Sequence, residues 1–375
     1  MATIDALSIP ASLLPADGRF GCGPSRIRPA QLRALLSHQG ILGTSHRQSP
    51  VKSTVARVRR GLTELLCLPD GHEVILGNGG STAFWDLAVF SLIRRRSLHH
   101  TLGEFSAKFA AEASGAPHLD SPIVVDAAPG TRPSLSSHPD VDAIAWPQNE
   151  TSTGVMMPVS RAPGATADQL HLVDATSAAG GVAVDLSGID AYYFAPQKAL
   201  GSDGGLWLAA LSPAAIERAQ EIATTSRWIP SFLSLTTAID NSRKDQTLNT
   251  PAVATLVLLA EQVDWLLEQG GLAWADARTR ESTSVLSAWV ERRPEASFYV
   301  GDPDARSQVV TTIDLDARID AASVLTVLRR HGIVDIDPYR KLGRNQLRIG
   351  TFPSVDPSDV EALVACLDHL LDALA

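Results

Sequence analysis

The sequence predicts an α/β protein whose main sheet is mostly parallel and is covered by helices on both faces. Short, almost continuous apolar runs recur between residues 73 and 211, which is typical of strands that are buried on both sides. Helical or loop segments separate these runs, and strands that alternate with helices form parallel sheets. The chain has 375 residues, so we expect a second, smaller domain beside the one that holds this sheet.

The first two thirds of the chain supply the elements of the main sheet. After an irregular start, residues 51–68 have the apolar spacing of a helix. Residues 73–77 (EVILG) then form a short apolar run, and the turn NGGST leads from it into an apolar helix. Further strand-like runs follow at residues 122–126, 142–146, 170–174, 190–196 and 204–211.

The pattern changes near residue 250. Residues 249–271 form a long helix that has a proline near its start and a glycine pair at its end. The rest predicts helices at 276–292, at 320–331 and from 356, with strands at 308–315 and 347–352. We therefore expect an N-terminal segment (1–20) that packs near the small domain, a large domain (21–255) and a small domain (256–375).

Composition excludes several classes of protein. The net charge of −9 argues against a nucleic-acid binder, because phosphate backbones are bound by clustered Lys and Arg. The sequence has no apolar run long enough to span a membrane, and its N-terminus lacks the basic start of a signal peptide. Cys22, Cys67 and Cys366 are far apart, so they form neither a zinc pattern nor a disulfide framework. We expect a cytoplasmic protein without a metal site.

Lysine is rare in this chain, which has 27 Arg and five Lys. Lysine amines can form covalent bonds to carbonyl carbons, so the search for such a residue is short. Lys198 follows an apolar run and precedes a glycine-containing loop, and Asp174 ends the preceding apolar run. Because ligands bind beyond the carboxyl ends of parallel strands, the amine and the carboxylate are placed to face one cleft. Taken singly, Lys198 also fits an exposed loop lysine and Asp174 a helix-capping residue.

The turn after residue 77 is a candidate anion site. Glycines let backbone N–H groups approach an anion, and the helix N-terminus that follows carries partial positive charge. Ser81 and Thr82 either donate hydrogen bonds to a ligand or cap the helix. An amine, a carboxylate, a polar helix start and an aromatic side chain are together what pyridoxal phosphate (PLP) requires. Phe105 is a candidate for the aromatic side chain, although plain core packing explains it equally well.

With these residues identified, the sequence resembles the phosphoserine aminotransferase family, which belongs to the class V, fold type I PLP enzymes. The resemblance runs over nearly the whole chain and depends on the order and spacing of its motifs. The segments that carry it are FGCGPSRIRP, TSHRQSP, NETSTG, VDATSA, APQKALG and LNTP. It implies a fold type I transferase with a mainly parallel, seven-stranded sheet, and a homodimer whose active sites are shared.

The resemblance also assigns the cofactor residues. Lys198 matches the Schiff-base lysine, and Asp174 matches the partner of the pyridine nitrogen. Phe105 falls where the family often has a tryptophan stacked on the cofactor ring, and Thr151 matches the residue that bonds the ring's phenolic oxygen. The matched phosphate positions are Gly80, Ser81 and Gln197 from the same subunit, and Asn249 and Thr250 from its partner.

For the substrate, the resemblance assigns cationic residues. Arg348 matches the arginine that grips the α-carboxylate, which a guanidinium can do with two parallel hydrogen bonds. His46 and Arg47 match the residues that meet the second acidic group, although as a pair they also fit a solvated loop. Lys341 stands where familiar members have a histidine, and with Arg344 it keeps the positive charge there.

The sequence departs from the family pattern at three places. Leu342 replaces the arginine that follows the histidine position at residue 341. Cys22 stands where many members have a serine near the substrate, and Ser81 stands where some have an arginine. The exact residues that grip the substrate phosphate therefore stay open.

The reaction that the resemblance implies is transamination between glutamate and 3-phosphohydroxypyruvate in L-serine biosynthesis. A related phosphorylated keto acid in pyridoxine biosynthesis is a side activity of the family. The alternatives are another class V aminotransferase, of the alanine–glyoxylate or serine–pyruvate type, and a catalytically silent PLP-binding protein. The cationic set of the substrate site argues against the first, since those substrates lack a second strong anion. The presence of both Lys198 and Asp174 argues against the second.

Overall fold

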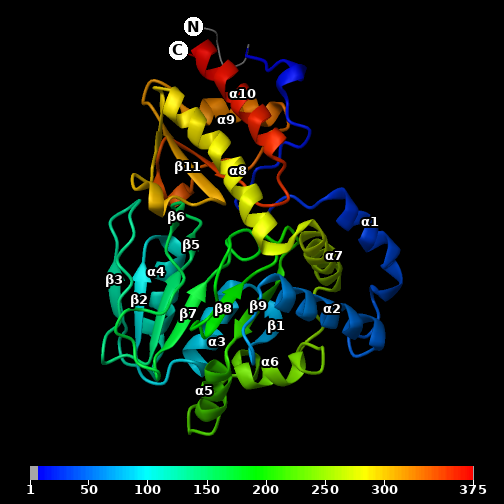
Figure 1. Ribbon diagram of the computed structural model, residues 1–375, viewed down its shortest axis with the longest axis vertical. Helices are drawn as coiled ribbons and strands as arrows, with labels where there is room; N and C mark the ends of the chain where they lie inside the picture. Colours follow the sequence, from blue (N-terminus) through cyan, green and yellow to red (C-terminus); the bar gives the residue numbers. More distant parts are fainter. Residues whose placement is uncertain (1–6, 375) are drawn as a thin grey trace.

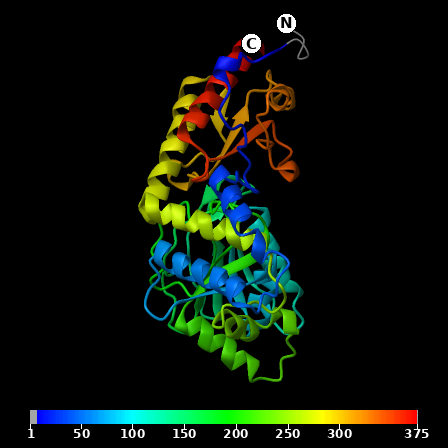
Figure 2. The same cartoon turned by 90° about the vertical axis from the view of Figure 1, so that its right-hand side faces the viewer.

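The computed structural model describes residues 7–374, which form two packed units, one above the other in Figure 1. The lower unit contains a seven-stranded sheet and the upper one a three-stranded sheet. Figure 2 shows the long helix α8 running up one side and joining the two units. Within residues 7–374, no helix is both long and apolar enough to cross a lipid bilayer.

The large sheet has the strand order β1-β9-β8-β7-β4-β2-β3. Strand β9 runs antiparallel to both of its neighbours, and the other adjacent pairs are parallel. The prediction of a mainly parallel, seven-stranded sheet is thus confirmed. Its strands are β1 (Glu73–Gly79), β2 (Ser97–Thr101), β3 (Ile123–Asp126), β4 (Ala143–Pro147), β7 (Leu170–Asp174), β8 (Ala191–Phe194) and β9 (Gly205–Leu211).

Helices cover both faces of this sheet. Successive side chains of a strand point to opposite faces, so Leu76 and Ile75 of β1 belong to different cores. Leu76 packs in the core that includes α2 and α7, and Ile75 in the core that includes α3 to α6. The helices are α2 (Ser49–Leu65), α3 (Ser81–Ser91), α4 (Glu104–Gly115), α5 (Pro213–Ala223), α6 (Leu235–Ser242) and α7 (Val253–Gln269).

The start of the chain is more regular than the sequence suggested. Helix α1 (Pro29–Ser37) begins with a proline, whose missing N–H costs nothing at a first helical position. It packs on α7, but its Leu32 and Leu36 are exposed, so these two leucines do not face the protein core. The short elements are η2 (Ala11–Leu13), η3 (Gln39–Ile41), η4 (Ser231–Leu233), η5 (Pro303–Ala305), η6 (Arg340–Leu342), β5 (Asn149–Glu150) and β6 (Val155–Met156).

The upper unit is an antiparallel sheet that packs against helices. Its core also takes in Leu7, Ile9 and Phe20, and Figure 1 shows the described N-terminal segment beside α10. Helix α8 contributes Leu272 to the lower core and Trp289 to the upper one. The elements are α8 (Gly271–Arg292), β10 (Ala296–Phe298), β11 (Val310–Leu315), α9 (Ala321–Arg330), β12 (Gln346–Gly350) and α10 (Pro357–Leu374).

The division of the chain into domains stays a prediction, but the packing bears on where it falls. Helix α7 lies beyond the expected boundary at residue 255 for most of its length, yet it packs against α2. Its Leu259, Val263 and Leu266 belong to the core of the large sheet. This packing favours a boundary at the end of α7, where Gly270 and Gly271 join it to α8.

Candidate active site

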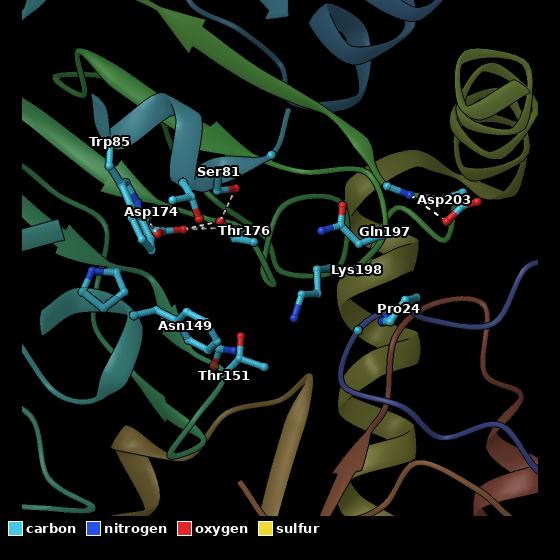
Figure 3. Close-up of a pocket in the computed structure, with 16 residues that line it drawn as sticks. Pro24, Ser81, Trp85, Asn149, Thr151, Asp174, Thr176, Gln197, Lys198 and Asp203 are labelled. Carbon is cyan, nitrogen blue, oxygen red and sulfur yellow. Dashed lines mark hydrogen bonds between the residues drawn. The ribbon is translucent and has the colours of Figure 1, made fainter. Parts of the chain in front are cut away.

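Neighbouring strand ends bring Asp174 and Lys198 together. Asp174 is the last residue of β7 and is paired in register with Tyr193 of the adjacent parallel strand β8. Lys198 follows shortly after the end of β8, so both side chains reach the same edge of the sheet. They line one cavity of about 410 Å³, which Figure 3 shows in close-up. The convergence expected from the sequence is present.

Lys198 is held in an environment that disfavours its charge. Burial lowers the pKa of its amine to about 8, and the positive charge of Arg348 acts in the same direction. The Nζ atom donates a hydrogen bond of 2.7 Å to the carbonyl oxygen of Cys22. The neighbouring Gly23 has a φ of +121°, and a Cβ atom there would overlap the Lys198 side chain, so the approach requires glycine. The amine is accessible in its neutral, nucleophilic form near neutral pH.

Asp174 is buried and receives three hydrogen bonds. Its Oδ1 accepts the backbone N–H of Thr176 at 2.9 Å and the Thr176 hydroxyl at 2.5 Å. Its Oδ2 accepts the indole N–H of Trp85 at 3.3 Å. Burial holds the pKa of this carboxyl above its usual value, and the bonds from Thr176 and Trp85 oppose that rise because they favour the charged form. The three donors are therefore placed to stabilise a carboxylate inside the cavity.

The N-terminus of α3 forms the polar end of the cavity. Gly80, Ser81 and Thr82 line it, with Gly80 as the residue just before the first helical turn. Gly79 has a φ of +123°, which explains the glycine in the turn. The Ser81 and Thr176 hydroxyls lie 2.6 Å apart, so Thr176 links this helix to Asp174. Free N–H groups at a helix N-terminus are a suitable site for a phosphate.

Phe105 lies at the side of the cavity, as the second residue of α4. The buried carboxylate of Glu150 fixes the start of this helix by accepting the backbone N–H groups of Phe105 (3.3 Å) and Ser106 (3.0 Å). The Phe105 ring also meets Tyr339 edge to face, with ring centroids 5.9 Å apart. An aromatic face at this position is available to a planar ligand.

PLP fits the residues that this cavity presents. Gln197 Oε1 and Asn149 Oδ1 are buried polar atoms without a hydrogen-bond partner, and both residues line the cavity. Buried polar atoms are normally paired, so these two are available to a ligand. Thr151 lines the same wall. The Lys198 amine, the Asp174 carboxylate, the helix N-terminus and the aromatic side chain are together the set of groups that the cofactor requires.

Arg348 lies beside the cavity without lining it. It extends from β12 of the upper unit, and its Nη1 donates to the carbonyl oxygen of Thr151 at 3.0 Å. Its guanidinium carbon is 5.4 Å from the centre of the Tyr339 ring. A substrate carboxylate bound by this guanidinium would be close to the residues of the cavity wall.

Lys341 and Arg344, which are also predicted to bind the substrate, form ion pairs outside the cavity. Lys341 forms an ion pair with Glu104, the residue before Phe105. Arg344 pairs with Asp314 at 2.5 Å and lies over the ring of Tyr299. Neither Lys341 nor Arg344 lines the cavity. Their predicted contact with the substrate stays a prediction, and it requires each to leave its present partner.

Four predicted residues form a separate cluster on the surface of the lower unit. His46 Nδ1 lies 3.1 Å from the Thr250 hydroxyl, and Arg47 Nη1 donates to Gln246 at 3.5 Å. Asn249 precedes Thr250 in the same exposed segment. None of these predicted residues lines the cavity of its own chain. Their contact with cofactor or substrate stays a prediction, and the resemblance implies that Asn249 and Thr250 reach the cofactor of a partner subunit.

The structure adds cavity residues that the sequence did not single out. Trp85, Asn149 and Thr176 line the cavity, together with Gly23, Pro24, Pro147, Asp203 and Gly204. A signal for Trp85 was present, because it follows Ser81 by four residues on the same helix face. Thr176 follows Asp174 by two residues, which is the spacing of a side chain that bonds a carboxylate at a strand end.

Comparison with known proteins gives first the class and then the family. The class V aminotransferase family profile matches residues 127–335, which is more than half of the chain. The fold and the PLP-compatible cavity agree with this class.

The phosphoserine aminotransferase of Rhodococcus opacus is 58% identical over 367 residues, covering 98% of each chain. That of a Nocardioides species is 58% identical over 372 residues, covering 99% of this chain and 100% of its own. A crystal structure of the enzyme from Cytophaga hutchinsonii has the same fold, with a TM-score of 0.88 at 24% identity over 94% of this chain and 99% of its own. The chain belongs to the phosphoserine aminotransferase family and is a PLP-dependent aminotransferase.

Proposed function

We propose that this enzyme transfers an amino group between glutamate and 3-phosphohydroxypyruvate, forming phosphoserine for L-serine biosynthesis. Identity of 58% to phosphoserine aminotransferases over almost the full length supports the substrate pair. The observation that supports the chemistry most is that the Lys198 amine and the Asp174 carboxylate line one cavity. Such a step in amino-acid biosynthesis is typical of the cytoplasm, where we place the enzyme.

When bound, PLP supplies an electron sink for the electron pair left on the substrate's Cα. Lys198 would hold the cofactor, and its amine would take the Cα proton as a general base and deliver it to the cofactor's C4′ carbon as a general acid, with the reverse transfer in the second half-reaction. Asp174 would keep a proton on the ring nitrogen through its buried carboxylate, whose charged form the bonds from Thr176 and Trp85 stabilise. Phe105 would cover one face of the ring, and Thr151 would bond its phenolic oxygen. Gly80, Ser81 and Gln197 would bind the cofactor phosphate.

The substrate needs two cationic contacts. Arg348 is the residue we assign to the α-carboxylate, since it reaches the cavity wall through Thr151. His46 and Arg47 are assigned to the second acidic group. Because they contact the segment that contains Thr250, and none of these residues lines its own cavity, we propose that they act in the site of a partner subunit. The functional unit is then a homodimer with shared sites.

A half-reaction screen tests this function. The purified holoenzyme is mixed separately with phosphoserine, glutamate, serine and alanine, and the change in its visible absorbance is followed. Phosphoserine and glutamate should each convert the bound cofactor rapidly, whereas serine and alanine, which lack a second anion, should react slowly. Rapid conversion by alanine or serine, with none by phosphoserine, would contradict the proposed substrate pair and favour another class V activity.

A further inference from the structure

Trp85 occupies a special place in the cavity. It lies on α3, four residues after Ser81, so the two side chains face the same side of the helix. Its side chain is 2% exposed, and its ring stacks on Phe109 with the planes 12° apart. Figure 3 shows the indole beside the Asp174 carboxylate. This burial and stacking give the indole a single defined orientation.

Both carboxylate oxygens of Asp174 are connected to helix α3, one through Thr176 and Ser81 and the other through Trp85. Oδ1 accepts from Thr176, whose hydroxyl also contacts Ser81, and Oδ2 accepts from the indole N–H. Ser81 and Trp85 are four residues apart on α3, a rise of about 6 Å. The first turns of α3 therefore set the distance between the proposed phosphate site and the carboxylate.

We propose that Trp85 is a positioning residue: its indole N–H fixes the orientation of the Asp174 carboxylate in the cavity and stabilises its charged form for cofactor binding. The inference rests on the proposed role of Asp174 in cofactor binding. The indole N–H is suited to this task because it only donates hydrogen bonds, so it never takes a proton from the carboxyl group. A hydrogen bond to the charged form of a buried acid favours that form.

A double-mutant cycle on cofactor affinity tests the proposal. The dissociation constant of PLP is measured for wild-type protein, Trp85→Phe, Asp174→Ala and the double variant. Phenylalanine keeps an aromatic ring against Phe109 but removes the N–H. We expect Trp85→Phe to weaken PLP binding roughly ten-fold in the wild-type background. In the Asp174→Ala background it should have almost no effect, since the acceptor of the bond is gone.

Kinetics give a second readout, since Trp85→Phe should lower kcat while leaving KM for glutamate nearly unchanged. The matched control is Trp289→Phe, which removes a buried indole N–H bonded to Asp368 in the upper unit. It should change neither PLP affinity nor kcat. If Trp85→Phe does not fold, a benzothienyl-alanine at position 85 keeps the shape of tryptophan without the N–H and replaces it in the cycle.

Two results overturn the role of Trp85: equal losses of PLP affinity in both backgrounds, which indicate packing alone, or no loss in the wild-type background. If Asp174→Ala binds PLP as tightly as wild type, the role of the carboxylate fails and the role of Trp85 fails with it. PLP affinity does not depend on which amino acid is the substrate. The half-reaction screen therefore detects a failure of the phosphoserine assignment separately.

Discussion

We expect the protonation of Lys198 to determine how fast the enzyme captures its cofactor. Burial lowers the pKa of the amine to about 8, and only the neutral amine attacks the cofactor's carbonyl carbon. Below that pKa the ammonium form predominates, so the neutral fraction rises as the pH rises. We expect the rate of PLP capture by the apoprotein to increase between about pH 6 and 9 and then to level off. Stopped-flow visible absorbance measures this rate. A rate still climbing beyond about pH 10 would indicate an ordinary, exposed lysine.

Replacing Lys198 tests whether this lysine, and not another, binds the cofactor. Lys198→Ala should lose the covalent cofactor band and lower transamination by on the order of a thousand-fold or more, because the nucleophile and the general base disappear together. Lys108→Ala is the control, since Lys108 is exposed on α4 and should leave both unchanged. Absorbance spectra and steady-state rates are the measurements. A Lys198→Ala protein that turns over at a normal rate would refute the assignment.

The sequence could predict site residues that stand within a local motif of the chain. Seven predicted cofactor residues line the cavity: Gly80, Ser81, Phe105, Thr151, Asp174, Gln197 and Lys198. Each stands in a recognisable strand-end or helix-start motif. Trp85 was missed because its partner Asp174 is 89 residues away, and that contact exists only after α3 packs on the sheet. Lys341 and Arg344 were predicted from their charge, but charge alone does not specify which carboxylate a flexible cation pairs with.

At the scale of elements, the start of α4 depends on one buried carboxylate. Glu150 accepts hydrogen bonds from the backbone N–H groups of Phe105 and Ser106 and from the Ser106 and Ser152 hydroxyls. It thus satisfies N–H groups that a helix N-terminus leaves unpaired, and its charge is favourable there. This explains structurally why a glutamate stands within the NETSTG segment.

Glu150→Gln should therefore destabilise the protein. The amide keeps the shape but replaces one acceptor oxygen with a donor and removes the charge. We expect a loss of about 2 kcal/mol in the free energy of unfolding, the value of a hydrogen bond to a charged group. Thermal denaturation of the apoprotein measures it, with Glu112→Gln on the same helix as the control. An unchanged midpoint for Glu150→Gln would show that the helix start does not need the carboxylate.

Elements were predictable where burial and pattern agree. The apolar runs of β4, β7, β8 and β9 are buried on both faces and were delimited within one or two residues. Strand β2 reads SLHHT and was not delimited, because His99 and His100 interrupt the apolar pattern although both are buried. Burial lowers the pKa of these two imidazoles to about 3 and about 4, so they lie neutral in the core. Neutral histidines can occupy a strand that polarity alone argues against.

At the scale of the whole molecule, the proposed sharing of sites has a consequence that mixed dimers reveal. One chain carries Lys198→Ala, and the other carries His46→Ala together with Arg47→Ala. Each parent homodimer should be nearly inactive toward phosphoserine. If His46 and Arg47 serve the partner's site, each mixed dimer has one intact site, with Lys198 from the second chain and the cationic pair from the first. Random reassociation should then restore about a quarter of wild-type activity.

The same mixture distinguishes the alternative in which His46 and Arg47 serve their own chain. Every site of a mixed dimer would then carry a defect, either at Lys198 or at the cationic pair, and mixing would restore nothing. Activity toward phosphoserine after co-refolding, compared with each parent alone, is the measurement. The Lys198→Ala chain mixed with itself controls for reassociation. Recovery on mixing supports a shared site, because neither chain alone supplies both the amine and the cations.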